Sequence, residues 1–137
     1  MAEVTQYNAK DCVITVDGVY ITGLGETMVS GEKDNEFFST AVGAQGDVVI
    51  NESNNDLGTI TLTVQATSPQ KSYLINLAKS RAVFPIWVVN KSINERMGGT
   101  KASIKNFPSL SQGTEAGERE FAIQVFDYTV EATATTE

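Results

Sequence analysis

Apolar and polar residues alternate along much of this chain with the two-residue period of β-strands. The clearest run covers residues 59–66, where one set of alternate positions is apolar and the other is polar. The apolar set is Ile60, Leu62, Val64 and Ala66, and the polar set is Thr59, Thr61, Thr63 and Gln65. Because successive side chains of a strand point to opposite faces, the run predicts a strand with one face in a core and the other outside it.

A hairpin is predicted before this strand, at the dipeptide Asp17-Gly18. The pair suits a type I′ turn, in which both central residues have positive φ. A two-residue turn places Val16 opposite Val19. It also places Ile14 opposite Ile21, so that four apolar side chains share one face of an antiparallel pair.

Shorter patterns predict strands over Glu26–Lys33 and Phe37–Val42, joined by a polar turn at residues 34–36. A short strand at 48–50 is followed by a loop. Phe37 and Phe38 are adjacent, so only one of them can point into a core, and the other must face solvent or a partner.

Strands are also predicted in the second half of the chain. Val83–Val89 is apolar on both faces, which predicts a central strand covered on both sides, with an edge or bulge at Pro85. Met97-Gly98-Gly99 predicts a turn. The apolar positions of Glu120–Val130 change phase partway, which indicates a bulge or a strand that crosses between two sheets.

One helix is predicted over residues 69–81. Ser68 suits its N-cap and Pro69 its first helical position. An apolar stripe at helical spacing follows, formed by Tyr73, Leu74, Leu77 and Ala78. With about seven to nine strands, this helix predicts a mainly β fold, an antiparallel β-sandwich or barrel with one flanking α-helix. The 137 residues suit a single domain, with residues 1–10 and 131–137 as flexible ends.

The composition offers little for catalysis. The chain has no histidine and one cysteine, Cys12, which removes the commonest general base and any cysteine-cluster zinc site. Glu32, Asp34 and Glu36 lack the spacing and the glycine of a calcium loop, so they predict an exposed turn. We therefore expect neither an enzyme nor a cofactor or metal site. No secretory signal or membrane-length apolar stretch is visible, so a cytoplasm is the expected place of synthesis.

Charge is distributed in blocks along the chain. The net charge of −7 argues against sequence-specific nucleic-acid binding. Residues 1–68 hold ten acidic and two basic residues, residues 69–114 one acidic and seven basic, and residues 115–137 six acidic and one basic. Such blocks are either solvated faces or the oppositely charged ends of a molecule that attracts a copy of itself head to tail.

Four segments of turns and strands stand in a particular order and spacing. They are Val16–Gly23, Met28–Asp34, Val42–Val48 and Asn54–Pro69. Together they resemble a family of structural proteins assigned as phage tail tube subunits, found mainly in phages with contractile tails. The likeness runs from Asp11 to Val89, with a weaker echo in Phe121–Val130.

The resemblance implies a single tail-tube-like domain of β-sandwich or barrel type that forms hexameric rings. The rings would stack into a tube whose inner strands line a conduit for DNA ejection, without sequence-specific binding. The implied partners are sister subunits and the tail sheath, tape-measure, baseplate and tail terminator proteins. The implied location is the virion tail, and the host cytoplasm during assembly. An acidic subunit fits this role because an acidic lumen repels phosphate.

The charge pattern and the resemblance together give a hypothesis for the subunit interface. The turn within Gly31–Thr40 would reach a neighbouring subunit or ring, and its acids would meet bases of residues 91–105. The candidate residues are Glu32, Asp34, Glu36, Phe37 and Phe38 on one side and Lys91, Arg96, Lys101 and Lys105 on the other. The polar set Thr59, Thr61, Thr63 and Gln65 is expected to face the lumen.

Other functions stay open at this point. The tube of a related bacteriocin or secretion particle would share the fold, and so could a tail-tip part; a sheath protein is usually far larger. A ligand-binding β-sandwich would need a concave aromatic site, for which Trp87 is the one large platform in the sequence.

Overall fold

The computed structural model describes residues 7–132, with the backbone alone at Glu26. The described chain forms ten strands, one α-helix and a short 3-10 helix. In chain order these are η1 (Ala9–Asp11), β1 (Cys12–Val16), β2 (Val19–Tyr20), β3 (Leu24–Lys33), β4 (Phe38–Val42), β5 (Val48–Glu52), β6 (Gly58–Gln65), α1 (Lys71–Ser80), β7 (Phe84–Asn90), β8 (Glu95–Ile104), β9 (Glu118–Val125) and β10 (Thr129–Ala132). Most of both expected flexible ends lies outside the described residues, but Ala132 still belongs to β10.

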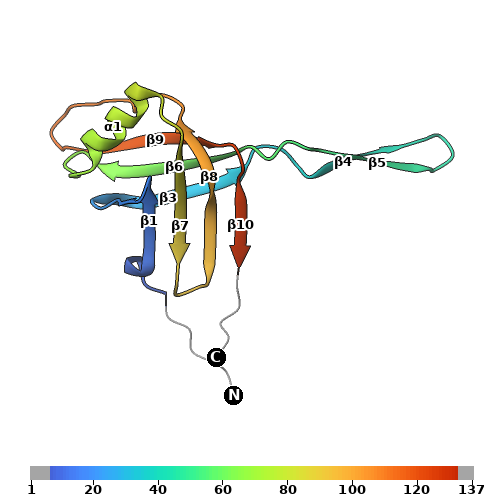
Figure 1. Ribbon diagram of the computed structural model, residues 1–137, viewed down its shortest axis with the longest axis horizontal. Helices are drawn as coiled ribbons and strands as arrows, with labels where there is room; N and C mark the ends of the chain where they lie inside the picture. Colours follow the sequence, from blue (N-terminus) through green and yellow to red (C-terminus); the bar gives the residue numbers. More distant parts are fainter. Residues whose placement is uncertain (1–6, 133–137) are drawn as a thin grey trace, which may run out of the picture.

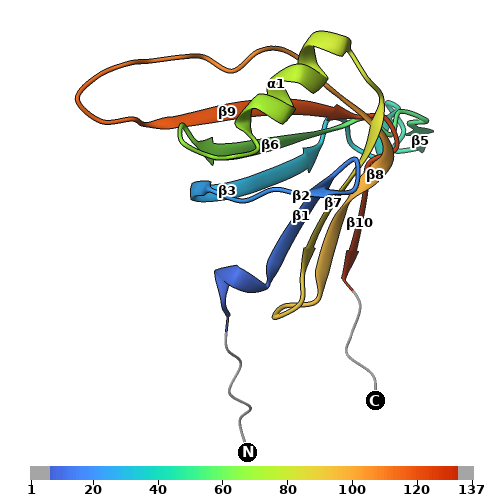
Figure 2. The same cartoon turned by 60° about the vertical axis from the view of Figure 1, so that its left-hand side comes forward.

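Eight strands form one antiparallel sheet in the order β2-β1-β7-β8-β9-β6-β3, with β10 pairing β8. The sheet curls into a half-barrel (Figures 1 and 2), in which β3, β6 and β9 form one layer and β1, β7, β8 and β10 form the other. Strand β8 joins the layers, because residues 102–104 pair with β9 and residues 95–98 pair with β10. The predicted mainly β fold with one flanking helix is confirmed.

The core fills the concave side of this sheet. Alternate residues of β6 and β9 are fully buried there, namely Ile60, Leu62, Val64, Phe121, Ile123 and Val125. Leu74 of α1 joins the same cluster, as do Val16 and Ile21 of the first hairpin. The helix and this hairpin therefore cover the core side of the β3–β6–β9 layer, and the helix lies on that side only (Figure 2).

The first hairpin has the predicted geometry. Asp17 and Gly18 both have positive φ, 52° and 80°, and Val16 pairs with Val19. The Ile21 amide donates to the Ile14 carbonyl at 3.0 Å. Glycine and aspartate tolerate this left-handed backbone, which is why the dipeptide is a dependable local signal.

The helix is shorter than predicted, because α1 begins at Lys71 and ends at Ser80. Gln70 is the N-cap residue, and the placement of the N-cap at Ser68 was wrong. The Ser68 hydroxyl instead donates to the Thr22 carbonyl at 2.6 Å and accepts from the Gln70 amide at 3.3 Å. Ser68 thus ties the segment before the helix to the chain that follows β2.

The turn predicted at Met97-Gly98-Gly99 is wrong, because these residues lie within β8 and the chain turns at residues 91–94. The glycines serve close packing instead. A Cβ on Gly98 would overlap the Ile86 carbonyl, and Gly98 has a φ of 144°. A side chain at Gly99 would meet Asp127. Glycine is needed here because two backbones approach closely. The sequence around a glycine does not show whether it serves such an approach or a turn.

Strand β7 is covered on one face, so the predicted double coverage is wrong. Phe84, Ile86 and Val88 are buried, whereas Pro85 is exposed. The expected irregularity at Pro85 is present, since the β7–β8 register shifts between Phe84 and Ile86. The phase change in 120–130 is also explained, because β9 ends at Val125 and the chain turns a corner into β10.

Candidate assembly surfaces

Strands β4 and β5 do not join the main sheet. They pair only with each other and project from the half-barrel as a long hairpin (Figure 1). We call residues 34–57 the arm and the remainder the body. The turn predicted at residues 34–36 to join two strands is wrong, because the chain only bends there and the flanking strands do not pair: Glu32 lies opposite Thr59 of β6, and Phe38 lies opposite Glu52 of β5.

The arm is apolar on one face. Its register places Val42 opposite Val48 and Thr40 opposite Ile50, on the same face as Phe38. The apolar residues of this face are all more than half exposed: Phe38 (53%), Val42 (67%), Val48 (60%) and Ile50 (61%). An isolated hairpin is only marginally stable in water, and a contiguous exposed apolar patch marks an interaction surface. The arm therefore presents a face that this chain alone does not cover.

Phe37, next to this face, is 73% exposed. Both phenylalanines are thus on the surface, although the strand pattern required only one of them to face outward. The reason is that β4 lies outside the body, where there is no core for either to reach.

The root of the arm is held firmly to the body. The Lys33 ammonium donates to the carbonyls of Asn35 and Asn55 at 2.7 and 2.8 Å, and so bridges the two chains of the root. It also lies 4.9 Å from the centre of the Phe37 ring. The Asp34 carboxylate accepts hydrogen bonds from Gln124 at 3.0 Å and Thr59 at 2.8 Å, and these two bonds lower the pKa of Asp34. Asp34 therefore anchors its own arm.

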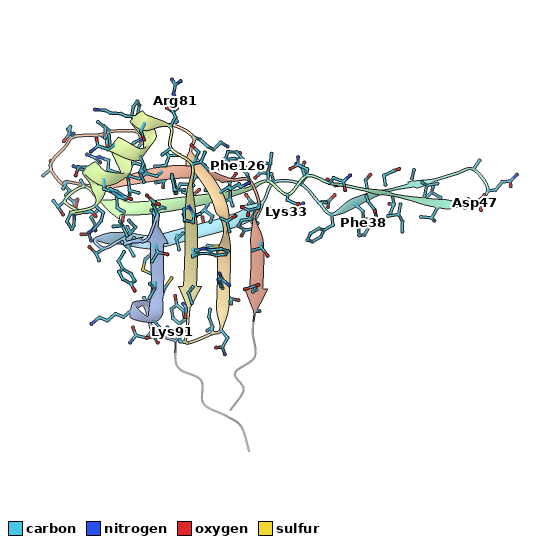
Figure 3. All side chains as sticks on the ribbon, in the orientation of Figure 1. Lys33, Phe38, Asp47, Arg81, Lys91 and Phe126 are labelled. Atoms are coloured by element: carbon cyan, nitrogen blue, oxygen red, sulfur yellow. The ribbon has the colours of Figure 1, made fainter. Side chains whose placement is uncertain are left out.

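The four predicted bases do not form one surface. Lys91 lies at the β7–β8 turn (Figure 3), while Lys101 and Lys105 lie near the other end of β8. Arg96 is engaged within the chain, since its guanidinium is 2.9 Å from a Glu131 carboxylate oxygen and 3.9 Å from the Trp87 ring centre. The candidate acids and phenylalanines of residues 32–38 are neighbours in the sequence, but the structure divides the bases between two ends of the body.

A basic groove lies at the Lys105 end of β8, and the sequence analysis missed it as a site. Its volume is about 460 Å³. The lining residues come from the end of α1 and from the segment around the end of β8: Ala78, Lys79, Arg81, Ser103, Ile104, Lys105, Asn106 and Phe107. The basic block of residues 69–114 was the available signal, but only the fold brings the helix end beside β8.

The polar set of β6 lies on the face of the β3–β6–β9 layer opposite the core. Thr59 and Thr61 are partly exposed, Gln65 is exposed and Thr63 is buried. The cross-strand partners on this face are Glu118, Glu120, Ala122 and Gln124 of β9 and Ser30 and Glu32 of β3. The face of these three strands is therefore polar and acidic, without a basic side chain among the residues named.

A cavity of about 750 Å³ opens at the mouth of the half-barrel. Its lining includes apolar side chains such as Met28, Met97 and Val130, and also Cys12, whose thiol pKa is raised by burial. Trp87 is not part of this lining, so the sequence-based candidate for a ligand platform lies elsewhere. Between residues 7 and 132, no cluster of His, Cys, Asp and Glu is placed to hold a metal ion. No helix in the same range is long and apolar enough to cross a membrane.

The half-barrel with its arm and flanking helix is similar in fold to chains of several contractile particles. A chain of the structure titled as the tube-terminating cap of the anti-feeding prophage matches with a TM-score of 0.67 and 11% identity, over 97% of this chain and 95% of that one. The PVC sheath/tube terminator, from an extracellular contractile injection system, matches with a TM-score of 0.70 and 14% identity, over 96% and 100%.

A chain of the PVC sheath–tube complex also matches, with a TM-score of 0.65 and 14% identity over 93% of each chain. No protein-family model and no curated protein matches the sequence. The similarity to tail tube proteins is thus confirmed for the fold.

Proposed function

We propose that this chain is a structural subunit of a phage-type tail tube, in which hexameric rings stack into a conduit with an acidic lumen for DNA ejection. One observation carries the proposal, namely an arm with an uncovered apolar face on a body that has the tube fold. A monomeric binding protein gains nothing from such an arm, whereas a subunit gains buried apolar area when the arm lies on a neighbour.

The polar face of β6 supports the proposed lumen. It lies opposite the helix, and the acids of its neighbouring strands would repel DNA phosphates so that DNA passes without sticking. The proposed site at Glu36 would lie in a contact between copies, whereas Glu32, opposite Thr59, shares the proposed lumen face. The sheath, tape-measure, baseplate and terminator proteins would be the further partners. Asp34 is a poorer choice for testing such contacts, because reversing its charge would also loosen its own arm root.

Negative-stain microscopy of concentrated protein tests the proposal. The wild type should give rings or hollow rods, and Val48→Ser/Ile50→Ser should not, because it removes the apolar face of the arm. Ala41→Ser/Val49→Ser is the matched control, since these two residues pair with each other on the opposite face of the same hairpin. Wild-type protein that stays monomeric at high concentration and tightly binds a small molecule would overturn the proposal.

A tube terminator is the second candidate, because two of the matched structures are titled as a cap and a terminator. A tube subunit must stack on both sides of its ring, whereas a terminator must stop growth on one side. Long rods from the purified chain favour the tube, and single rings that bind only the ends of existing tubes favour the terminator. The tube of a bacteriocin or injection particle would give the same rods, so rods support a tube subunit of either kind of particle.

A further inference from the structure

We infer that the basic groove between the end of α1 and the end of β8 is the receptor for the acidic arm of a second copy of this chain. The inference rests on the proposed function and deepens it, because it names the surface that the arm contacts. The groove and the arm are different surfaces, so the contact is heterologous and repeats around a ring or along a filament.

Charge complementarity is the first argument. The arm, residues 34–57, contains five acidic residues and no basic residue. Glu36, Asp47 and Glu52 are exposed on it, and Asp47 lies at its tip (Figure 3). The groove is lined by Lys79, Arg81 and Lys105 and by no acidic residue. Opposed charges of this kind steer association and fix its register.

The groove also offers apolar and backbone surface to a strand. Phe107 in its lining is more than half exposed. Strand β8 pairs with β7 only as far as Ala102, so in the described chain the side of β8 that faces away from β9 has no strand partner at Ser103 and Ile104. An edge of this type accepts an added chain segment.

At the arm root, Asp34 lies within electrostatic reach of Lys105 of its own chain, but the arm beyond the root points away from the groove. In Figure 3 the tip at Asp47 lies at the far end of the arm, while Arg81 lies above the body on the other side of the arm root. The hydrogen bonds of Lys33 and Asp34 hold the root in this direction. The partner must therefore be another copy.

Nucleic acid is the other polyanion that a basic groove could attract. The net charge of −7 and the small number of bases favour the arm, since binding to duplex DNA relies on neutralising many phosphates. DNA binding is accordingly one outcome of the test.

Charge reversal at the groove tests the inference. We expect Arg81→Glu/Lys105→Glu to raise the protein concentration needed for half-maximal assembly at least tenfold by light scattering, with an unchanged thermal unfolding midpoint. Lys105→Glu alone should give a smaller shift in the same direction, and added salt should weaken wild-type assembly. Lys10→Glu/Lys71→Glu is the control, because it makes the same change of charge outside the groove, on η1 and at the start of α1. Combining the groove reversal with Glu36→Lys/Glu52→Lys on the arm should restore assembly.

The outcomes separate the two proposals. If the wild type never assembles, the proposed function fails and the inference fails with it. If the wild type assembles and the groove variant matches Lys10→Glu/Lys71→Glu, or the arm reversal does not restore assembly, the inference alone is wrong. A groove that retards a fluorescent DNA duplex, with loss of that binding in the groove variant, would also overturn it in favour of a nucleic-acid site.

Discussion

The body and the arm are made of the same kind of antiparallel strand, yet they differ in what holds them. In the body, β6 packs three fully buried apolar residues against β9, α1 and the first hairpin. In the arm, every residue of β4 and β5 is exposed. A strand in the body is therefore stabilised by burial within one chain, whereas the arm depends on its root and, in our proposal, on a neighbour. Stability and assembly should thus respond to different residues.

The largest effect is expected from the body. Phe121→Ala removes a fully buried ring from the centre of the core, and should lower the free energy of unfolding by about 3–5 kcal/mol. Phe38→Ala on the arm removes the same kind of side chain from an exposed site, and should change the free energy of unfolding by less than about 0.5 kcal/mol. Urea denaturation of both variants measures the difference. Similar losses would mean that the arm is part of the folded core.

The corner between β9 and β10 should give an intermediate effect. Asp127 accepts hydrogen bonds from the Thr100 hydroxyl at 2.6 Å and from the amides of Thr100 and Lys101. Partial burial of this carboxyl acts to raise its pKa, but these hydrogen bonds outweigh burial and hold the pKa below the usual value of an aspartate. Asp127→Ala should cost about 1–2 kcal/mol at neutral pH, after a discount for solvent exposure.

The pH dependence of Asp127 has a definite sign. Because the folded-state pKa is the lower one, its contribution is fully present above the unfolded value and is lost as the pH falls through the folded-state pKa. The difference in unfolding free energy between wild type and Asp127→Asn should shrink over that acidic range. A difference that stays constant into strong acid would show that the carboxylate charge is not what matters.

A smaller effect on stability is expected at the arm root. Lys33→Met keeps most of the side-chain stem but loses both carbonyl contacts, and should change the unfolding free energy by less than about 1 kcal/mol. Amides of β4 and β5 should then exchange faster with solvent, and assembly should weaken. Lys10→Met, remote on η1, is the control for loss of one positive charge. Unchanged exchange in the arm would show that Lys33 does not fix its direction.

The smallest effect on the free chain is expected at the polar face of β6. Thr61→Cys in a Cys12→Ser background should fold normally and react with a bulky maleimide as a monomer. In assembled rods a lumen-facing cysteine should be protected, because the reagent must enter from the tube ends. Full reactivity in intact rods would place this face outside the lumen.

Local sequence signals determined the parts of this protein whose conformation depends on neighbouring residues. The alternation in 59–66, the Asp17-Gly18 turn and the bulge at Pro85 all follow from backbone preference and side-chain period, and all are present. The sequence also indicated the basic block, although not the groove, because Lys79 and Lys105 come together only through the packing of α1 beside β8.

Tertiary structure decided the rest. The Gly98-Gly99 pair has the local sequence of a turn, but it lies within a strand because β7 and the β9–β10 corner pack closely against it. Ser68 has the local sequence of an N-cap, but its hydroxyl donates to the Thr22 carbonyl. The strands of the arm have an ordinary pattern, and nothing in it says that they leave the sheet. Hydrophobic period fixes which side chains share a face, but only the pairing of distant strands decides whether that face meets its own core or is left for another molecule.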